Sequence, residues 1–376
     1  MQWAVSFMSD RRSLLIWDWG RRGAGPVVAL QLARRLIEQG YGDRIALSLS
    51  EQNELMGEFR QLGVPISSVH TFTGEPSLWR LTQSVTSLLR SFSKHLARHC
   101  PTTILVTMLF GAALPLAPFA RRAVTRFVYV VHDVRPHPGE RIGLELRVGQ
   151  TGLLCLADRL VTLSQAMRAE LVALHPRLGG RTFVEPLAGL YDRLHAARAF
   201  PEGRRTRFLV AGRQVRYKGF ERLAQALRRL DGADFEVTIA GDGPEQNRIK
   251  ELFGSMRNVM LSPGWMCAAE HRRQFEVHDV QLCAYDEGSQ SGLICDGLSM
   301  AMPTIVTPIG ALPEQIGFGR AGWVTADMSA QALADLIVQV ARGEGDYARR
   351  SEACGMMLDE DRAASTWART LGLVEL

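Results

Sequence analysis

The stretch from Phe208 to Pro244 constrains the fold most, because apolar runs and a helical pattern alternate within it. Phe208–Ala211 has the length and composition of a buried strand, and it stops at Gly212. Apolar side chains then recur at the spacing of one helix face, at Phe220, Leu223, Leu227 and Leu230. A second strand-like run, 235–240, ends in Gly-Asp-Gly-Pro. This order predicts a βαβ unit and hence a parallel sheet covered by helices.

The same alternation recurs along the chain in two series, which a polar segment containing proline and glycine separates at 200–206. A chain of 376 residues is also too long for one ordinary core. We therefore predict an α/β fold with two Rossmann-like, doubly wound parallel-sheet domains, at residues 1–199 and 200–364. The predicted strands are 13–17, 44–48, 102–108, 126–131, 159–164, 208–211, 235–240, 258–261, 279–284, 304–307 and 323–324.

Composition excludes several classes of protein. None of the six cysteines forms a CxxC pair, so reduced thiols are expected. The chain has no basic-then-apolar leader, and we expect a cytoplasmic protein. The uncharged run Pro101–Ala120 is long enough for a bilayer, but Gly111, Pro115 and Pro118 interrupt it, which favours a strand plus a loop. We expect no metal, since no clustered metal-ligand spacing occurs, and no nucleic-acid partner.

Two cations follow the first strand of the βαβ unit. Arg213 and Lys218 lie between Gly212 and the next helix, where open α/β sheets bind their ligands. Fixed cations beside a helix N-terminus suit a diphosphate. The alternative is a pair of solvated charges at a strand end.

A second candidate site follows the strand 279–284. Ser289, Gln290 and Ser291 precede a helical pattern that begins near Gly292. Backbone N–H groups at such a helix start can bind a phosphate group. The alternative is an ordinary N-capped helix beside an exposed Glu287.

The sequence of residues 205–342 resembles the donor half of the family-4 retaining glycosyltransferases. These enzymes have the GT-B fold, in which two domains face a cleft. The family has two glutamates separated by seven residues, whereas Glu287 and Asp296 are separated by eight. The resemblance implies that Asp296 binds the donor ribose. It leaves open whether Glu287, or the turn from Ser289 to Ser291, replaces the first glutamate. It further implies a last helix, 365–376, that packs back on the first domain.

The resemblance covers the N-terminal half only in outline. The loop Gly20–Gly25 follows the first strand, and Gly23 and Gly25 would let its backbone approach donor phosphate or acceptor. His132 ends a buried strand in the place of the family's histidine near the transferred sugar; His137 is a second candidate. Glu314 either faces the donor pocket or starts a helix as an acid favoured by the helix dipole. A tight turn without ligand is the alternative for the glycine loop.

The resemblance implies a metal-independent, retaining transfer of a sugar from a nucleoside diphosphate sugar to a hydroxyl acceptor, without any cofactor. A nucleotide-sugar 2-epimerase and a catalytically silent GT-B binding protein are the alternatives. Residues 76–132 contain no acid and seven bases, and residues 1–199 carry a net charge of +9 against −4 for 200–376. Trp79 and Phe92 lie among those bases. A basic amphipathic helix suits an anionic membrane surface, so we predict peripheral membrane binding and a lipid-linked or glycan acceptor in cell-surface polysaccharide assembly. The alternative is a core-facing helix with a solvated outer face.

Overall fold

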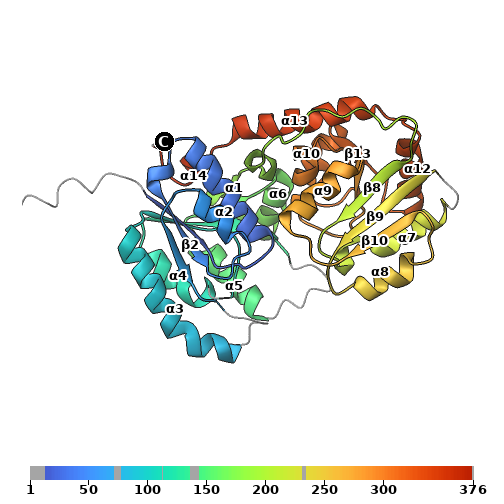
Figure 1. Ribbon diagram of the computed structural model, residues 1–376. Helices are drawn as coiled ribbons and strands as arrows, with labels where there is room; N and C mark the ends of the chain where they lie inside the picture. Colours follow the sequence, from blue (N-terminus) through green and yellow to red (C-terminus); the bar gives the residue numbers. More distant parts are fainter. Residues whose placement is uncertain (1–12, 72–77, 112, 136–143, 231–233, 375–376) are drawn as a thin grey trace, which may run out of the picture.

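The computed structural model describes residues 13–71, 78–111, 113–135, 144–230 and 234–374. Within these ranges the chain forms two wholly parallel sheets, one of seven strands and one of six. The sheets belong to two α/β domains that lie side by side (Figure 1). The predicted pair of doubly wound parallel-sheet domains is therefore confirmed.

The N-terminal sheet has the order β3-β2-β1-β4-β5-β6-β7. Side chains of its inner strand β1 alternate between two cores: Leu14 and Ile16 join one, Leu15 and Trp17 the other. Burial on both faces explains why the sequence reads as continuous apolar runs. The strands are β1 Leu14–Asp18, β2 Ile45–Ser50, β3 Ile66–Val69, β4 Thr103–Val106, β5 Arg126–Val131, β6 Arg159–Thr162 and β7 Thr182–Val184.

Helices cover both faces of this sheet. Helices α1 and α2 share one core with the sheet, whereas α3, α4, α5 and α6 share the other. The run 101–120 forms β4 and then helix α4, so the expectation of a strand plus a loop missed that helix. Among the described residues, no helix is long and apolar enough to cross a membrane. The helices are α1 Ala24–Glu38, α2 Met56–Gln61, α3 Leu78–His99, α4 Ala113–Arg122, α5 Leu144–Leu156 and α6 Gln165–Leu174.

The C-terminal sheet has the order β10-β9-β8-β11-β12-β13. Its strands are β8 Thr206–Ala211, β9 Phe235–Gly241, β10 Val259–Pro263, β11 Val280–Cys283, β12 Thr304–Val306 and β13 Gly322–Val324. Its helices are α7 Phe220–Arg228, α8 Gln246–Phe253, α9 Ala268–Val277, α10 Gly292–Ser299, α11 Leu312–Gln315 and α12 Ala330–Ala341. Short 3-10 turns also occur, at Gly42–Arg44, Pro176–Arg181, Leu187–Leu190, Arg216–Lys218 and Gly317–Gly319.

The chain returns from the second domain to the first through helix α13, Tyr347–Ala364, which runs along the top of Figure 1 toward α14. The sequence predicted one helix from 365 onward; the structure has only one helical turn there, α14 Trp367–Thr370, after the longer α13. Leu371 packs in the same core as β1, and its carbonyl accepts from Thr103 and Arg126. The domain limits themselves stay predictions.

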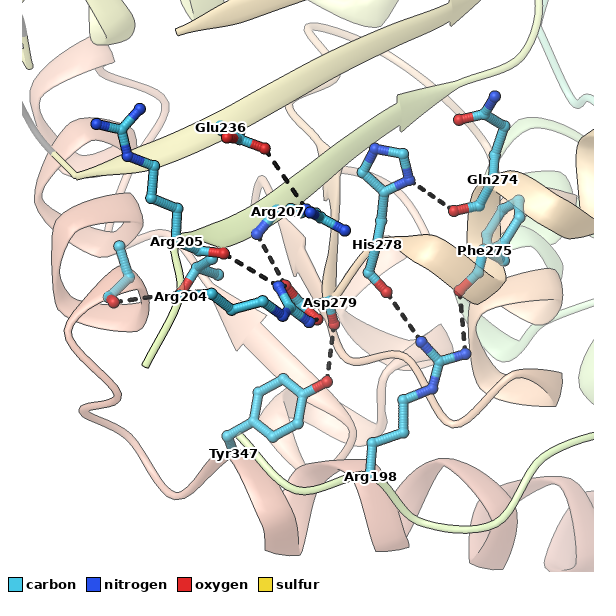
Figure 2. A network of polar contacts seen from close by, with 12 residues as sticks. Arg198, Arg204, Arg205, Arg207, Glu236, Gln274, Phe275, His278, Asp279 and Tyr347 are labelled. Atoms are coloured by element: carbon cyan, nitrogen blue, oxygen red, sulfur yellow. Dashed lines mark hydrogen bonds and ion pairs between the residues drawn. The ribbon is translucent and has the colours of Figure 1, made fainter. Parts of the chain in front are cut away.

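The segment between the domains is fixed to the C-terminal one (Figure 2). The guanidinium of Arg204 donates to both carboxylate oxygens of the buried Asp279, over 2.7 and 2.6 Å. Arg198 donates to the carbonyls of Phe275 and His278, and the Tyr347 hydroxyl donates to the Asp279 carbonyl. Arg198 and Arg204 therefore anchor this segment to the second domain.

Candidate functional site

The C-terminal sheet has its switch point between β8 and β11. The chain leaves β8 toward β9 on one side and leaves β11 toward β12 on the other, so the loops after these two strands diverge. Ligands of open α/β sheets bind at such a point, outside the carboxyl ends of the strands. The loop after β8 carries Arg213 and Lys218, and the loop after β11 carries Glu287 and leads into α10.

Lys218 is a buried cation at this point. Only 8% of the residue is exposed, and its Nζ donates to the Ala211 carbonyl over a long 3.4 Å. The ammonium also lies 5.2 Å from the centre of the Tyr285 ring. Burial, with a smaller contribution from the nearby charge of Arg213, lowers the pKa of Lys218 to about 8, although Cys283 opposes that shift. The surroundings of the Lys218 amine therefore disfavour its charged form, and a bound anion would favour it.

Gly212 brings this cation against the first turn of α10. A Cβ added to Gly212 would lie 3.1 Å from the Lys218 Nζ and 2.8 Å from Leu293 Cδ1. The backbone there has a φ of +93°, which favours glycine. The end of β8, the Lys218 ammonium and the N-terminus of α10 are therefore neighbours. A helix start with a cation beside it is a site for an anion.

Arg213 is exposed at the same strand end. It lies beside Tyr217. Burial raises the pKa of the Tyr217 hydroxyl, and the Arg213 guanidinium opposes that shift. The structure thus brings together the two cations that the sequence singled out, one buried and one open to solvent.

The two loops touch through Gly219. Its φ is +73°, and a Cβ there would lie 1.8 Å from the Ala284 carbonyl oxygen. The backbone N–H groups of Asp286 and Glu287 donate to the Tyr217 carbonyl, over 2.8 and 3.3 Å. The Glu287 side chain itself is exposed. Its role as the family's first carboxylate stays a prediction.

The turn from Ser289 to Gly292 is held from behind by α11. The Ser291 N–H donates to Gln315 Oε1 over 2.8 Å, and Gln315 Nε2 donates back to the Ser291 carbonyl. The Ser291 hydroxyl lies 3.0 Å from the Tyr285 hydroxyl. The backbone N–H of Ser291 therefore already has an acceptor in Gln315, which corrects the expectation that it binds phosphate. Gly292 opens α10, and its N–H lies in the first turn, beyond the reach of an intrahelical acceptor.

Neighbouring residues differ in their access to a ligand. Ser289 is buried, and its carbonyl accepts from the Ala311 N–H. Gln290 is half-buried, and its Oε1 has no hydrogen-bond partner among the described residues. An acceptor left without a donor in this turn is consistent with a ligand-facing amide.

Asp296 lies on the second turn of α10, half-exposed. Its Oδ2 is 3.1 Å from Nε2 of His271 on α9, and the His271 ring packs 5.0 Å from Phe275. The carboxylate therefore lies in the helix that borders the predicted phosphate site. The contact with His271 was not predicted, because the two residues lie 25 positions apart in the sequence.

The N-terminal sheet presents its own polar residues at the carboxyl ends of β1, β4 and β5. His132 is buried, and its Nε2 donates to the Thr107 carbonyl over 2.7 Å. Burial lowers the pKa of His132, although Asp133 and the carbonyl oppose that shift. A neutral ring with its proton on Nε2 leaves Nδ1 as an acceptor. His137 lies outside the described residues.

The glycine-rich loop closes over a buried carboxyl group. Asp18 ends β1, and its Oδ1 accepts from the Gly20 N–H over 2.8 Å, while no described group pairs with Oδ2. Burial raises the pKa of Asp18 to about 7. Gly25 packs so tightly that a Cβ would lie 3.0 Å from Met108, and Gly23 has a φ of +88°. Sequence reasoning missed Asp18, although the rule applied to His132, a polar residue at a strand's carboxyl end, also selects it.

Two contacts join the domains near these loops. Both carboxylate oxygens of Glu314 accept N–H groups at the start of α6, from Gln165 over 2.7 Å and from Ala166 over 2.8 Å. Arg22 of the glycine-rich loop lies over the exposed ring of Trp265, 5.1 Å from its centre. Glu314 lies in the first turn of α11, as the helix-start alternative predicted, and its carboxylate also caps α6 of the opposite domain.

Two parallel-sheet domains, with a buried cation and a helix start at the switch point of the second, define a two-domain, doubly wound α/β protein with a candidate anion site at that point. Residues 205–342 match the family model "Glycosyl transferases group 1", and residues 23–186 match "Glycosyl transferase 4-like domain". The chain belongs to the family-4 glycosyltransferases with the GT-B fold.

Relatives and solved structures agree with this assignment. The chain is 26% identical over 151 residues to an amylovoran biosynthesis glycosyltransferase of Erwinia amylovora, covering 37% of each chain. It is 25% identical over 148 residues to a protein of Salmonella typhimurium provisionally named a colanic acid biosynthesis glycosyltransferase, covering 37% of this chain and 36% of the relative. The chain therefore spans little more than a third of the length of these relatives.

The fold comparison covers nearly the whole chain. The Anabaena protein HepE, solved with UDP and glucose, has a TM-score of 0.73 at 18% identity, over 96% of this chain and all of that one. A UDP-GlcNAc 2-epimerase from Neisseria meningitidis has a TM-score of 0.57 at 12% identity, over 93% and 99% of the two chains. The same fold thus serves both a protein that binds a nucleotide with a sugar and an epimerase.

Proposed function

We propose that the protein is a retaining, metal-independent glycosyltransferase. It transfers a sugar from a nucleoside diphosphate sugar to a hydroxyl group of a lipid-linked or glycan acceptor in cell-surface polysaccharide or glycolipid synthesis. The observation that carries the proposal is Lys218, a buried cation next to Gly212 and the start of α10. Cleavage of a sugar–phosphate bond leaves a charged diphosphate, and preorganised cations and N–H groups at that point stabilise the transition state.

In the proposed mechanism the acceptor hydroxyl attacks on the face that the diphosphate leaves. Lys218 and Arg213 hold the leaving group, which stabilises the oxocarbenium-like centre and takes the proton of the hydroxyl. Asp296 accepts hydrogen bonds from the ribose. Neutral His132 offers an acceptor nitrogen toward the sugar. No resident cofactor is needed for these steps, because charge neutralisation and positioning supply the chemistry.

The relatives and one solved structure support the proposed class of substrate. HepE was solved with UDP and glucose, and two relatives are named for colanic acid and amylovoran biosynthesis. These names favour a uridine diphosphate sugar as donor and a growing polysaccharide intermediate as acceptor.

The proposed membrane contact rests on the outer face of α3. Arg90, Lys94 and Arg98 are exposed, whereas Leu88 and Phe92 are buried in the core. Phe92 stacks on Trp17, with 4.3 Å between the ring centres. Its side chain therefore cannot contact a membrane, which corrects the expectation from the sequence. The side chain of Trp79 lies outside the described part of the helix. What supports peripheral binding at the cytoplasmic face is therefore charge alone, worth roughly 1 kcal/mol for each base near an anionic surface.

The first test is a thermal-shift panel of nucleotide sugars, since a ligand of the folded state raises its apparent stability. Arg213→Ala should reduce turnover at least about tenfold, because one charge-assisted contact is lost. Arg216→Ala is the matched control, an exposed arginine of the same loop, and should leave turnover near that of the parent.

Further measurements separate the proposed transferase from the alternative functions. Retention is checked by NMR of the product's anomeric proton, and metal independence by turnover in a chelator. Conversion of the nucleotide sugar without any acceptor would identify an epimerase. Binding without either reaction would identify a binding protein. Equal turnover in Arg213→Ala and parent would contradict the diphosphate assignment.

A further inference from the structure

A groove lies on the N-terminal domain, between the edge strand β3 and helix α3, away from the donor residues. It has a volume of about 410 Å³ and is open to solvent. Its lining residues are Ile66, Ser67, Ser68, Ser91, Lys94, His95 and Arg98. Serines come from both walls, and two cations come from the helix.

The charge of the groove has one sign. Lys94 and Arg98 lie four residues apart and therefore project from the same face of α3. Both are exposed, so both side chains are available to a ligand. None of the described residues that line the groove is acidic, so no carboxylate competes for these cations.

Buried hydrogen bonds orient the imidazole that lines the groove. The Trp19 indole N–H donates to the Ser48 hydroxyl over 2.9 Å, and that hydroxyl lies 2.9 Å from Nδ1 of His95. The Ser48 proton is thus available to Nδ1, which places the proton of a neutral ring on Nε2. Burial, with His99 and Arg98, lowers the pKa of His95 to about 4, in accord with a neutral ring.

A second hydrogen bond ties the two walls together. The Ser67 hydroxyl on β3 lies 2.8 Å from Nε2 of His99 on α3. Because β3 and α3 are joined in this way, the two walls of the groove are held at a fixed distance from one another.

We propose that this groove binds a phosphate group, either of an anionic phospholipid headgroup or of a soluble phosphate ester. Lys94 and Arg98 supply the charge, and the hydroxyl of Ser91, on the same face of α3, supplies a neutral donor, which is the chemistry that a phosphate oxygen requires. The site rests on residues other than those of the donor site. It makes the proposed membrane contact more specific, from a diffuse basic face to one headgroup position.

The test uses the full chain at low salt with two probes. Glycerol phosphate is titrated and followed by calorimetry, and sedimentation is measured with vesicles of equal parts phosphatidylglycerol and phosphatidylcholine. The groove variant is Lys94→Gln with Arg98→Gln. The control is Arg60→Gln with Arg177→Gln, which removes the same charge from exposed positions of the N-terminal domain outside both the groove and the basic run 76–132.

We expect the groove variant to lose at least about tenfold in affinity for one or both probes and the control to stay within about twofold of the parent. Binding of glycerol phosphate but not vesicles identifies a soluble ester as ligand, and the reverse identifies a headgroup. Equal weakening in both variants would mean a diffuse charge effect and would overturn the proposal, as would absence of binding to both probes. The thermal shift with nucleotide sugar should persist in the groove variant, so failure here is distinct from failure of the donor site.

Discussion

Replacement of Lys218 by methionine should stabilise the donor-free protein and abolish its response to nucleoside diphosphate. Burial lowers the Lys218 pKa from 10.5 to about 8. Since one pKa unit corresponds to about 1.4 kcal/mol, the charged amine costs the folded state about 3 kcal/mol at pH 7. Methionine removes that cost and keeps most of the side-chain volume. It loses the long contact with the Ala211 carbonyl and the contact with the Tyr285 ring, so the net gain should be about 1–3 kcal/mol.

The two pKa values of Lys218 fix how the free energy of unfolding changes with pH. Between pH 8 and 10.5 the unfolded chain keeps the Lys218 proton and the folded chain releases it, so the parent gains stability as pH rises. The advantage of the variant is therefore full below pH 8 and lost near pH 10.5. Urea denaturation at several pH values, with and without UDP, measures both effects. Lys250→Met, on the exposed face of α8, is the control and should change little. A destabilised Lys218→Met variant, or one that UDP still stabilises, would refute the reasoning.

Three further changes test the frame of the site. Asp296→Asn should weaken UDP binding by about tenfold in calorimetry without loss of stability, and equal affinity would count against a ribose contact. Glu314→Gln removes the charge at the start of α6 and should lower urea stability by about 0.5–2 kcal/mol; an unchanged midpoint would make the contact energetically neutral. Gly219→Ala should destabilise by more than about 3 kcal/mol, because its Cβ meets the Ala284 carbonyl, whereas Gly203→Ala, with a φ of +75° and nothing within 4 Å, should cost only about 1 kcal/mol.

The fold was largely predictable because the central strands are apolar on both faces. β3 and β7 were missed: each lies at an edge, and their sequences, Ile-Ser-Ser-Val and Thr-Phe-Val, are too short and polar to read as strands. Helix α13 was also missed. Its buried positions include Ser351 and Cys354, and Gly355 occurs where a Cβ would lie 2.6 Å from Nε of Arg193. The buried positions of α13 recur at helical spacing, but several of them are occupied by small or polar residues.

The candidate site was predictable where one segment supplies it. Arg213, Gly212 and Lys218 lie on a single loop, so their spacing indicated a cation pair at a strand end. The partners that fix the site come from distant segments. Gln315 takes the Ser291 N–H, and His271 pairs with Asp296, contacts that depend on tertiary packing and leave no local signal.

The return of the chain to the first domain has a consequence for biosynthesis. Trp367, Leu371 and Leu373 are fully buried in the core that also contains Leu14 and Ile16. The carbonyls of residues 369–371 and 373 accept hydrogen bonds from Arg44, Arg126 and Arg159. During translation, the first half of the protein thus leaves the ribosome before the segment that completes its core and accepts these hydrogen bonds. It can complete its packing only after the second domain has been synthesised, so the order of synthesis and the order of folding differ.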